Sequence, residues 1–120
     1  MSWDKELNLQ QLDDALEQYR VLAEQLRPKT GWINAIRTAL GMSARTLGEH
    51  IGLSQPRVAL IEKGEVDGTI TLNTLEKAAQ GLGCRVVYSL VPEEPSLQAM
   101  RKAQALKKAN QLNLYSETHM

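Results

Sequence analysis

Apolar residues recur at helical spacing along most of this chain, and the first run predicts a long amphipathic helix. Over residues 4–27 they follow one another at steps of three and four, a spacing that places them on one helix face. Pro28 ends this helix. The face has two open interpretations: it packs on the chain's own core, or it docks another helix or a partner protein. Its members are Leu9, Leu12, Leu16, Tyr19, Ala23 and Leu26.

Two short helices joined by a glycine turn are predicted within residues 42–64. Ser43 caps the first helix by accepting a hydrogen bond from a backbone N–H of its first turn. Gly52 supplies the left-handed backbone conformation that ends this helix. Ser54 caps the second helix, which has a proline in its first turn and is expected to end at Gly64.

Neither helix is long enough to be stable alone in water, so the two must pack on each other and on a third element. Gly48 lies on the inner side of the first helix, where a side chain larger than a methyl group would hold the second helix away. The apolar positions that form this contact are Leu47, Ile51, Leu53, Val58 and Ile61.

The second helix starts with polar residues of the types that contact DNA. Ser54, Gln55 and Arg57 remain outward, and Gln pairs with adenine whereas Arg pairs with guanine or phosphate. The same spacing also fits a plain helical hairpin with a solvated face. The flanking segments and the charges therefore decide between the two interpretations.

A helix over residues 31–40 precedes this pair. We expect Thr30 to cap it and Trp32 to anchor it in the core. Arg37 lies near its inner face, and a buried Arg needs a carboxylate partner. The expected partner is Glu62 on the second helix of the pair.

After the pair we expect an acidic loop over residues 65–68 and a helix over 72–81 capped by Thr71. Residues 85–91 are rich in β-branched and aromatic types, which favours a strand. A lone strand needs a partner, so we expect it to pair with a second copy or a second protein, or with residues 69–71.

The predicted last helix, residues 96–112, has a basic side and no acidic residue. Its basic side is either a solvated face or a phosphate contact at the flank of a dimer.

The formal net charge is zero, but the charges are segregated along the sequence. Residues 28–64 carry five bases and two acids, whereas residues 1–27 carry six acids and three bases. Residues 65–95 are again acidic, and residues 96–120 are basic. The predicted DNA-contacting segment therefore lies in a basic block, which suits a phosphate-binding surface.

Length and composition favour a cytoplasmic protein with one modest core. The chain has 120 residues, of which 42% are hydrophobic and 23% charged. No apolar run approaches the length of a membrane span. The one cysteine, Cys84, is expected to be a small buried apolar residue and cannot form an internal disulfide.

We expect no catalytic residue, no cofactor and no metal site. No nucleophile and base can be paired, and no Gly-rich phosphate loop is present. His50, His119 and Cys84 are too isolated in the sequence to form a metal site. The acids at 65–67 and 93–94 are interpreted as loop residues without a chemical role.

Residues 31–91 resemble the phage-repressor (XRE-type) helix-turn-helix domain, through the short first helix of the motif, the turn at Gly52 and the ending Glu62-Lys63-Gly64. The chain is more narrowly similar to the mobile mystery protein A family. The segments that carry this resemblance are Gly31–Arg37, Ala39–Met42, Ser54–Pro56, Gly68–Leu72 and Leu82–Pro92.

The resemblance implies a transcriptional regulator encoded beside a Fic-domain toxin, for which this chain is antitoxin and autorepressor. Relatives contact phosphate through a Gln at the position of Ala44, so that role passes here to Arg45 or Ser43, with Lys63 as a further contact. The glutamate motif by which Fic-inhibiting antitoxins block the active site is not found. The resemblance places base reading on Ser54, Gln55, Arg57 and Val58, and the buried ion pair on Arg37 and Glu62.

These observations predict a mainly α protein: a helix within residues 1–28, a helix-turn-helix domain over 29–84, and a strand and helix over 85–120 for dimerisation or partner binding. We expect a homodimer that binds palindromic double-stranded DNA in the major groove, at half-sites about one helical turn (~34 Å) apart. The alternative is a protein-interaction module that neutralises a partner toxin without sequence-specific DNA binding.

Overall fold

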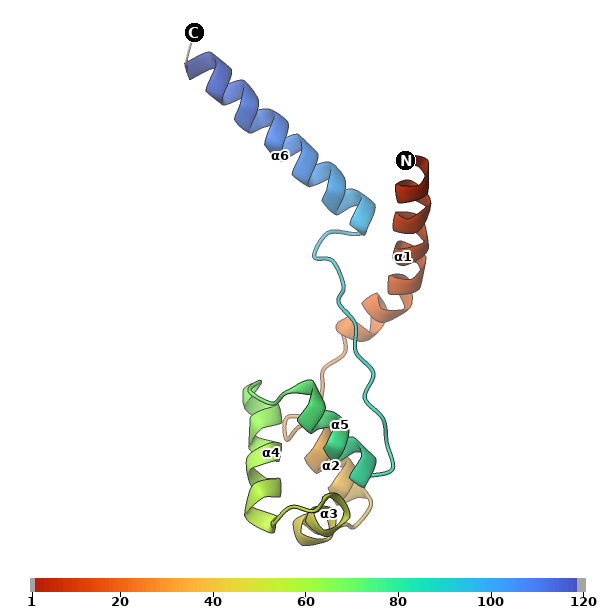
Figure 1. Ribbon diagram of the computed structural model, residues 1–120, viewed down its shortest axis with the longest axis vertical. Helices are drawn as coiled ribbons and strands as arrows, with labels where there is room; N and C mark the ends of the chain where they lie inside the picture. The colour runs from red at the N-terminus through yellow and green to blue at the C-terminus, as the bar shows by residue number, and fades with distance from the viewer. Residues whose placement is uncertain (1, 119–120) are drawn as a thin grey trace. The chain divides into compact units, whose positions relative to one another are not determined.

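A computed structural model describes residues 2–118, and the side chains of residues 7–112. His119 lies outside the described residues. Over this range the fold is all helical, as Figure 1 shows. The helices are α1 (Ser2–Ala23), α2 (Trp32–Ala39), α3 (Ala44–Ile51), α4 (Gln55–Asp67), α5 (Leu72–Gly81) and α6 (Leu97–Thr118). None of them is long and apolar enough to cross a bilayer.

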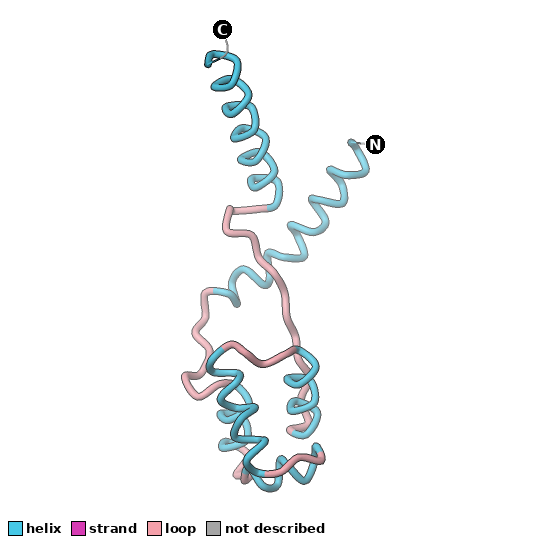
Figure 2. The backbone as a smooth tube through the Cα atoms, turned by 60° about the vertical axis from the view of Figure 1, so that its left-hand side comes forward, coloured by secondary structure: helices cyan, strands magenta, loops and turns pink. Residues whose placement is uncertain are grey.

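The predicted strand over residues 85–91 is wrong. This segment is loop, and Figure 2 shows no strand in the part of the chain that is described. No backbone hydrogen bond joins it to residues 69–71 or to any other described segment. β-Branched and aromatic residues favour a strand because their side chains pack well on the half-buried surface of a sheet. Without a second strand no such surface forms, so the composition alone does not make this segment a strand.

The chain divides into two compact units. One is Leu26–Tyr88 and contains α2 to α5. The other combines the N-terminal segment up to Gln25 with the segment that starts at Ser89, so it contains α1 and α6.

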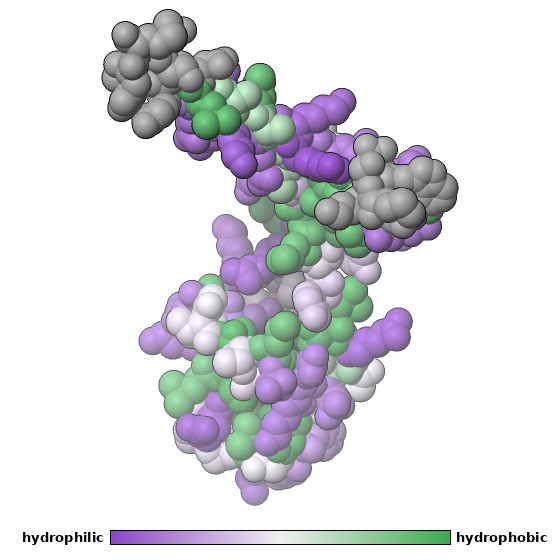
Figure 3. Space-filling model, turned by 45° about the horizontal axis from the view of Figure 1, so that its top comes forward, coloured by the Kyte–Doolittle hydropathy of each residue, from purple (hydrophilic) through white to green (hydrophobic). Residues whose placement is uncertain are grey.

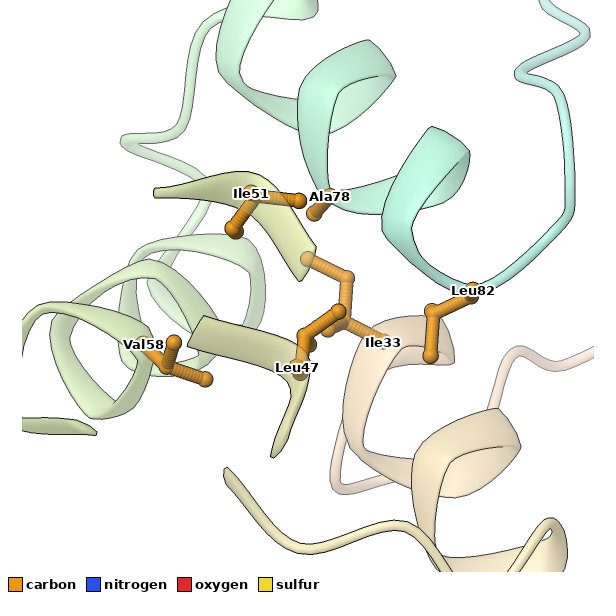
Figure 4. Close-up of a cluster of buried hydrophobic side chains, with 6 residues drawn as sticks. All are labelled: Ile33, Leu47, Ile51, Val58, Ala78 and Leu82. Carbon is orange, nitrogen blue, oxygen red and sulfur yellow. The ribbon is translucent and has the colours of Figure 1, made fainter. Parts of the chain in front are cut away.

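The core of the Leu26–Tyr88 unit is built by all four of its helices. Figure 4 shows the buried side chains converging between the helices. Leu47 and Val58 are its largest fully buried side chains. The core residues are Ile33 from α2, Leu47 and Ile51 from α3, Val58 from α4, and Ala78 and Leu82 at α5.

Three of the predicted helix caps are confirmed. The Ser43 hydroxyl accepts a hydrogen bond from the Thr46 N–H at 3.0 Å, and the Thr71 hydroxyl accepts from the Thr74 N–H at 3.2 Å. Ser54 caps α4 in the same way. These caps satisfy backbone donors that have no partner within the helix.

Several predicted helix boundaries differ from the structure. Helix α4 does not end at Gly64 but continues to Asp67 and ends at Gly68, so the expected acidic loop over residues 65–68 is the last turn of a helix. After Gly68 the chain turns back on the helix, and the N–H of Thr69 and that of Ile70 both donate to the Gly64 carbonyl.

The start of α2 also differs from the prediction. Its N-cap is Gly31, at φ 85°, and not Thr30. Trp32 is 53% exposed and does not anchor the core; Ile33 takes that role. The single cysteine is likewise exposed and not buried.

The unit of α1 and α6 is held together at the start of α6. Both carboxylate oxygens of Asp13 on α1 accept backbone N–H bonds, from Leu97 at 2.7 Å and from Gln98 at 3.3 Å. Arg20 donates to the carbonyl of Glu94 at 3.0 Å. The acidic side of α1 thus supplies a cap for α6, which places negative charge at a helix N-terminus.

The apolar face of α1 is only partly covered within this unit. Leu9, Leu16 and Tyr19 are half-buried, whereas Leu12 is 53% exposed. Leu26, the last residue of the predicted face, lies beyond the end of α1 and belongs to the Leu26–Tyr88 unit, where it is 96% exposed. Helix α1 ends at Ala23 and not at residue 27, because a last turn without packing partners is not stable by itself. The docking interpretation of this face stays a prediction.

Candidate nucleic-acid interface

Helices α3 and α4 meet through a close backbone contact at Gly48. The Leu53 N–H donates to the Gly48 carbonyl at 2.8 Å, and Gly52 takes φ 72° in the turn between the helices. A Cβ built on Gly48 would collide with the carbonyl oxygen of Leu53. The prediction that Gly48 faces the second helix is therefore confirmed, and the contact is tighter than expected, because even a methyl group does not fit.

The first turn of α4 is exposed on all sides that do not face the core. Ser54, Gln55, Pro56 and Arg57 are all exposed. Pro56 removes one N–H that has no helical acceptor, and the Arg57 N–H faces the Ser54 hydroxyl at 3.4 Å. This turn therefore combines satisfied backbone donors with side chains that are open to a partner.

Val58 cannot belong to such a surface, and its placement among the DNA-contacting residues is a mistake. Its side chain is 1% exposed and packs in the core of the unit. A side chain buried in this core cannot reach a base edge without unfolding the domain. Val58 instead fixes the rotation of α4 about its own axis.

The rotation fixed in this way determines which residues of α4 face outward. At 3.6 residues per turn, successive side chains are about 100° apart around the axis. The inner side of α4 carries Val58, Ile61, Glu62 and Glu65, which are all buried or half-buried. The outward side carries mainly exposed residues, with the half-buried Gly64 near one edge; the exposed residues are Gln55, Pro56, Arg57, Ala59, Leu60, Lys63, Val66 and Asp67.

Gln55 and Arg57 lie on opposite edges of this outward side. They are two positions apart, a separation that does not bring side chains of a helix together. Both are exposed, and neither side chain forms an ion pair or a hydrogen bond with another of the described residues. They can therefore reach two different parts of a partner that receives α4.

The residues predicted to contact phosphate differ in whether their side chains already have a partner in the structure. Lys63 is exposed on the outward side, about 12 Å along the axis from Gln55. Arg45 on α3 is exposed, with its Nε 3.5 Å from a carboxylate oxygen of Glu49, and an exposed pair of this kind is weak enough for a phosphate to replace. The Ser43 hydroxyl is exposed but already engaged with Thr46.

The expected partnership of Arg37 and Glu62 is present. Arg37 donates from Nε to Glu62 Oε1 at 2.7 Å and from Nη2 to Oε2 at 3.3 Å, so the contact is bidentate. Arg37 Nη1 also donates to the Met42 carbonyl at 2.9 Å, and Asn34 Nδ2 donates to Glu62 Oε2 at 3.0 Å. The network joins α2, the start of the motif and α4.

Glu65 is a structural residue, and its prediction as a loop acid without a role is wrong. It is 4% exposed, and its two carboxylate oxygens accept the backbone N–H bonds of Trp32 at 2.8 Å and Ile33 at 2.9 Å. The carboxylate thus caps α2 from a different helix, at the positive end of its dipole. Its spacing of three from Glu62 and seven from Val58 places it on the inner face, which was the available signal.

Other candidate chemistry is not gathered into a site. Among the described residues no three His, Cys, Asp or Glu side chains lie close enough to hold a metal ion. His50 lies with Nδ1 3.0 Å from the Gly81 carbonyl, at the contact of α3 and α5. The surface of this unit mixes hydrophilic and apolar residues, as the lower body in Figure 3 shows.

A family model described as "Helix-turn-helix" matches residues 33–89, which span α2 to α5. No curated protein and no solved structure matches the chain. Over this segment, which is slightly less than half of the chain, the sequence is similar to helix-turn-helix domains.

Proposed function

We propose that the protein is a sequence-specific transcriptional regulator that inserts the N-terminal half of α4 into the major groove. The observation that carries this proposal is the orientation of α4, whose inner side is fixed in the core while its first turn is exposed. An α-helix fits the width of the major groove, where each base pair displays a distinct pattern of donors and acceptors.

In this proposal Gln55 reads a base edge, with adenine as the favoured base. Arg57, on the opposite edge of the exposed side, binds guanine or a phosphate. Arg45 and Lys63 bind phosphates on the two sides of the groove, together with the backbone N–H groups at the start of α3. Ser43 and Ser54 act mainly by capping the helices that position these groups.

The test is a binding titration of the full chain on DNA from upstream of its own gene, with random DNA as control, at two salt concentrations. Preferential binding that survives moderate salt supports the regulator. Equal binding to both DNAs that disappears with salt is an electrostatic contact only, and it contradicts sequence-specific reading. Arg57→Ala should weaken binding, whereas Arg85→Ala, an exposed arginine of the same unit outside α4, should not.

We propose that the regulator acts as a homodimer. Support comes from an apolar cavity of about 310 Å³, which Trp32, Ile36 and Leu75 line together with the loop segment 84–87. Trp32 and Val87 are exposed beside it, and the backbone of this loop makes no described backbone hydrogen bond beyond Cys84. A second copy would cover the apolar surface and double the number of base contacts.

Sedimentation of the free protein tests the dimer. A monomer at the concentrations that bind DNA would contradict it, and Val87→Asp should dissociate a dimer formed through this surface. Footprints should then show two half-sites about one helical turn apart.

We further propose an antitoxin role toward a Fic-domain toxin, on the basis of the resemblance to the mobile mystery protein A family. The exposed apolar residues of α1, such as Leu12 and Leu22, are the surface on which such a partner would dock. Co-purification with a Fic-domain protein encoded in the neighbouring gene is the test. Leu12→Asp should abolish that association and leave DNA binding intact. Competition between the partner and DNA would instead show that the partner binds α4, and it would contradict docking on α1.

A further inference from the structure

The middle of the outward side of α4 is apolar. Leu60 is 61% exposed, although it lies in a helix whose opposite side is packed in the core. It follows Pro56 by four positions, so the two side chains lie one above the other on the exposed surface. Neither residue belongs to the core of the unit, and the fold does not explain why this position is apolar.

Polar and cationic residues frame this apolar centre. Lys63 is the next residue on the same face, three positions after Leu60. Gln55 and Arg57 stand at the two edges of the face, and both are exposed. Asp67, seven positions after Leu60, is an exposed acid at the C-terminal end of the same face. The part of the face that fits a partner with anionic margins and an apolar group in the middle is therefore the N-terminal part, up to Lys63.

Duplex DNA has this arrangement at one kind of base pair. Phosphates line both margins of the major groove, and the C5-methyl group of thymine is the apolar group among the base edges in its floor. A leucine in the groove excludes water from such a methyl group, and it cannot form the hydrogen bonds that the edges of guanine and cytosine require. The charges and the apolar centre of the face thus select thymine.

We infer that Leu60 is a specificity-determining residue that contacts the C5-methyl group of one thymine in each half-site. The inference rests on the proposed function and adds to it the base that the centre of α4 recognises. It assigns Gln55 and Arg57 to flanking positions of the site.

The experiment begins with selection of the preferred sequence from random duplexes by the full-length chain. Each thymine of that sequence is then replaced singly by deoxyuridine, which lacks only the methyl group. One replacement per half-site should weaken binding about fourfold, the factor that corresponds to one buried methyl group. Replacements at thymines outside the contact should leave the affinity unchanged.

Two variants connect this effect to the side chain. Leu60→Ala should bind the thymine and the deoxyuridine duplex equally, because the alanine no longer reaches the methyl group. Val66→Ala is the matched control, since Val66 is also an exposed apolar residue of α4 but lies near its C-terminal end. It should keep the fourfold difference.

The outcomes separate this inference from the proposed function. If the chain selects a sequence but tolerates deoxyuridine at every position, the thymine contact is overturned and the regulator stands. A Leu60→Ala variant that keeps the fourfold difference also overturns it, because another residue then reads the methyl group. If no sequence is selected, sequence-specific reading fails, and the thymine contact fails with it. The deoxyuridine series uses the unaltered protein, so its result does not depend on how a variant folds.

Discussion

Replacement of Glu65 tests whether a carboxylate on α4 holds the start of α2. The side chain is 4% exposed, and each of its oxygens accepts one backbone N–H, from Trp32 and from Ile33. Glu65→Gln keeps the volume but leaves one of these N–H groups facing an amide N–H. Glu65→Ala removes both acceptors and also opens space beside Gly31, whose Cβ position lies against the carboxylate.

The magnitude follows from these two hydrogen bonds. A hydrogen bond to a charged group contributes about 1.5–3 kcal/mol, and an N-cap contributes about 1 kcal/mol. The free energy of unfolding of the helix-turn-helix unit should therefore fall by about 2 kcal/mol in Glu65→Gln and by about 2–4 kcal/mol in Glu65→Ala. For a unit of this size, about 2 kcal/mol lowers the melting temperature by about 8–16 °C.

Thermal and urea unfolding followed by circular dichroism measure these changes. Glu76→Gln is the control, because Glu76 is an exposed acid on α5 that loses the same charge. A Glu65→Gln variant that melts together with the control would refute the cap. At a temperature where the variant is fully folded, its DNA affinity should equal that of the unaltered chain, since Glu65 lies on the inner side of α4.

Three further outcomes follow from the geometry. Glu62→Ala should lower the free energy of unfolding by about 3–5 kcal/mol, since it leaves Arg37 without its carboxylate, and a double-mutant cycle with Arg37 should show a coupling energy above about 0.5 kcal/mol. If the losses of unfolding free energy are additive, Arg37 and Glu62 do not stabilise each other. Gly48→Ala should cost about 1–3 kcal/mol in a melting experiment, because the new methyl group meets the Leu53 carbonyl. Arg57→Ala should cost about 1–3 kcal/mol of binding free energy if Arg57 reads guanine, whereas an equal loss on specific and random DNA identifies a phosphate contact.

The parts of the fold that sequence could predict are those encoded within a few residues. Ser43, Ser54 and Thr71 each cap the helix that follows them, and Gly52 adopts its turn for a local steric reason. The caps, the turn and the apolar spacing together placed α3, α4 and α5. The network of Arg37 could also be predicted, because a buried cation requires a partner and few carboxylates were available.

The wrong predictions concern residues whose structural partner is distant in the sequence or absent. Glu65 caps a helix that begins 33 residues earlier, so no local pattern marks it as a cap. Trp32 has the composition of a core residue, but its neighbour Ile33 occupies the inner position. The segment 85–91 has the composition of a strand without a second strand in the described chain.

Two predictions for Val58 exclude each other. Its spacing from Ile61 predicted an inner position, whereas the resemblance assigned it to DNA. Packing decides for the first, because a residue that is 1% exposed cannot serve both purposes. The outward positions Ala59 and Leu60 follow from the same helix geometry once Val58 is fixed inside.

In α4 the residues that stabilise the fold are different from the residues that are open to a partner, whereas many binding surfaces use the same residues for both. Val58, Glu62 and Glu65 attach the helix to its domain, and none of them lies on the side that faces a partner. The outward residues therefore make little contribution to whether the domain folds. If α4 reads DNA as proposed, mutations there can retarget the protein to another operator in single steps, each through a folded intermediate, and the domain is then a scaffold on which new DNA preferences can evolve or be engineered.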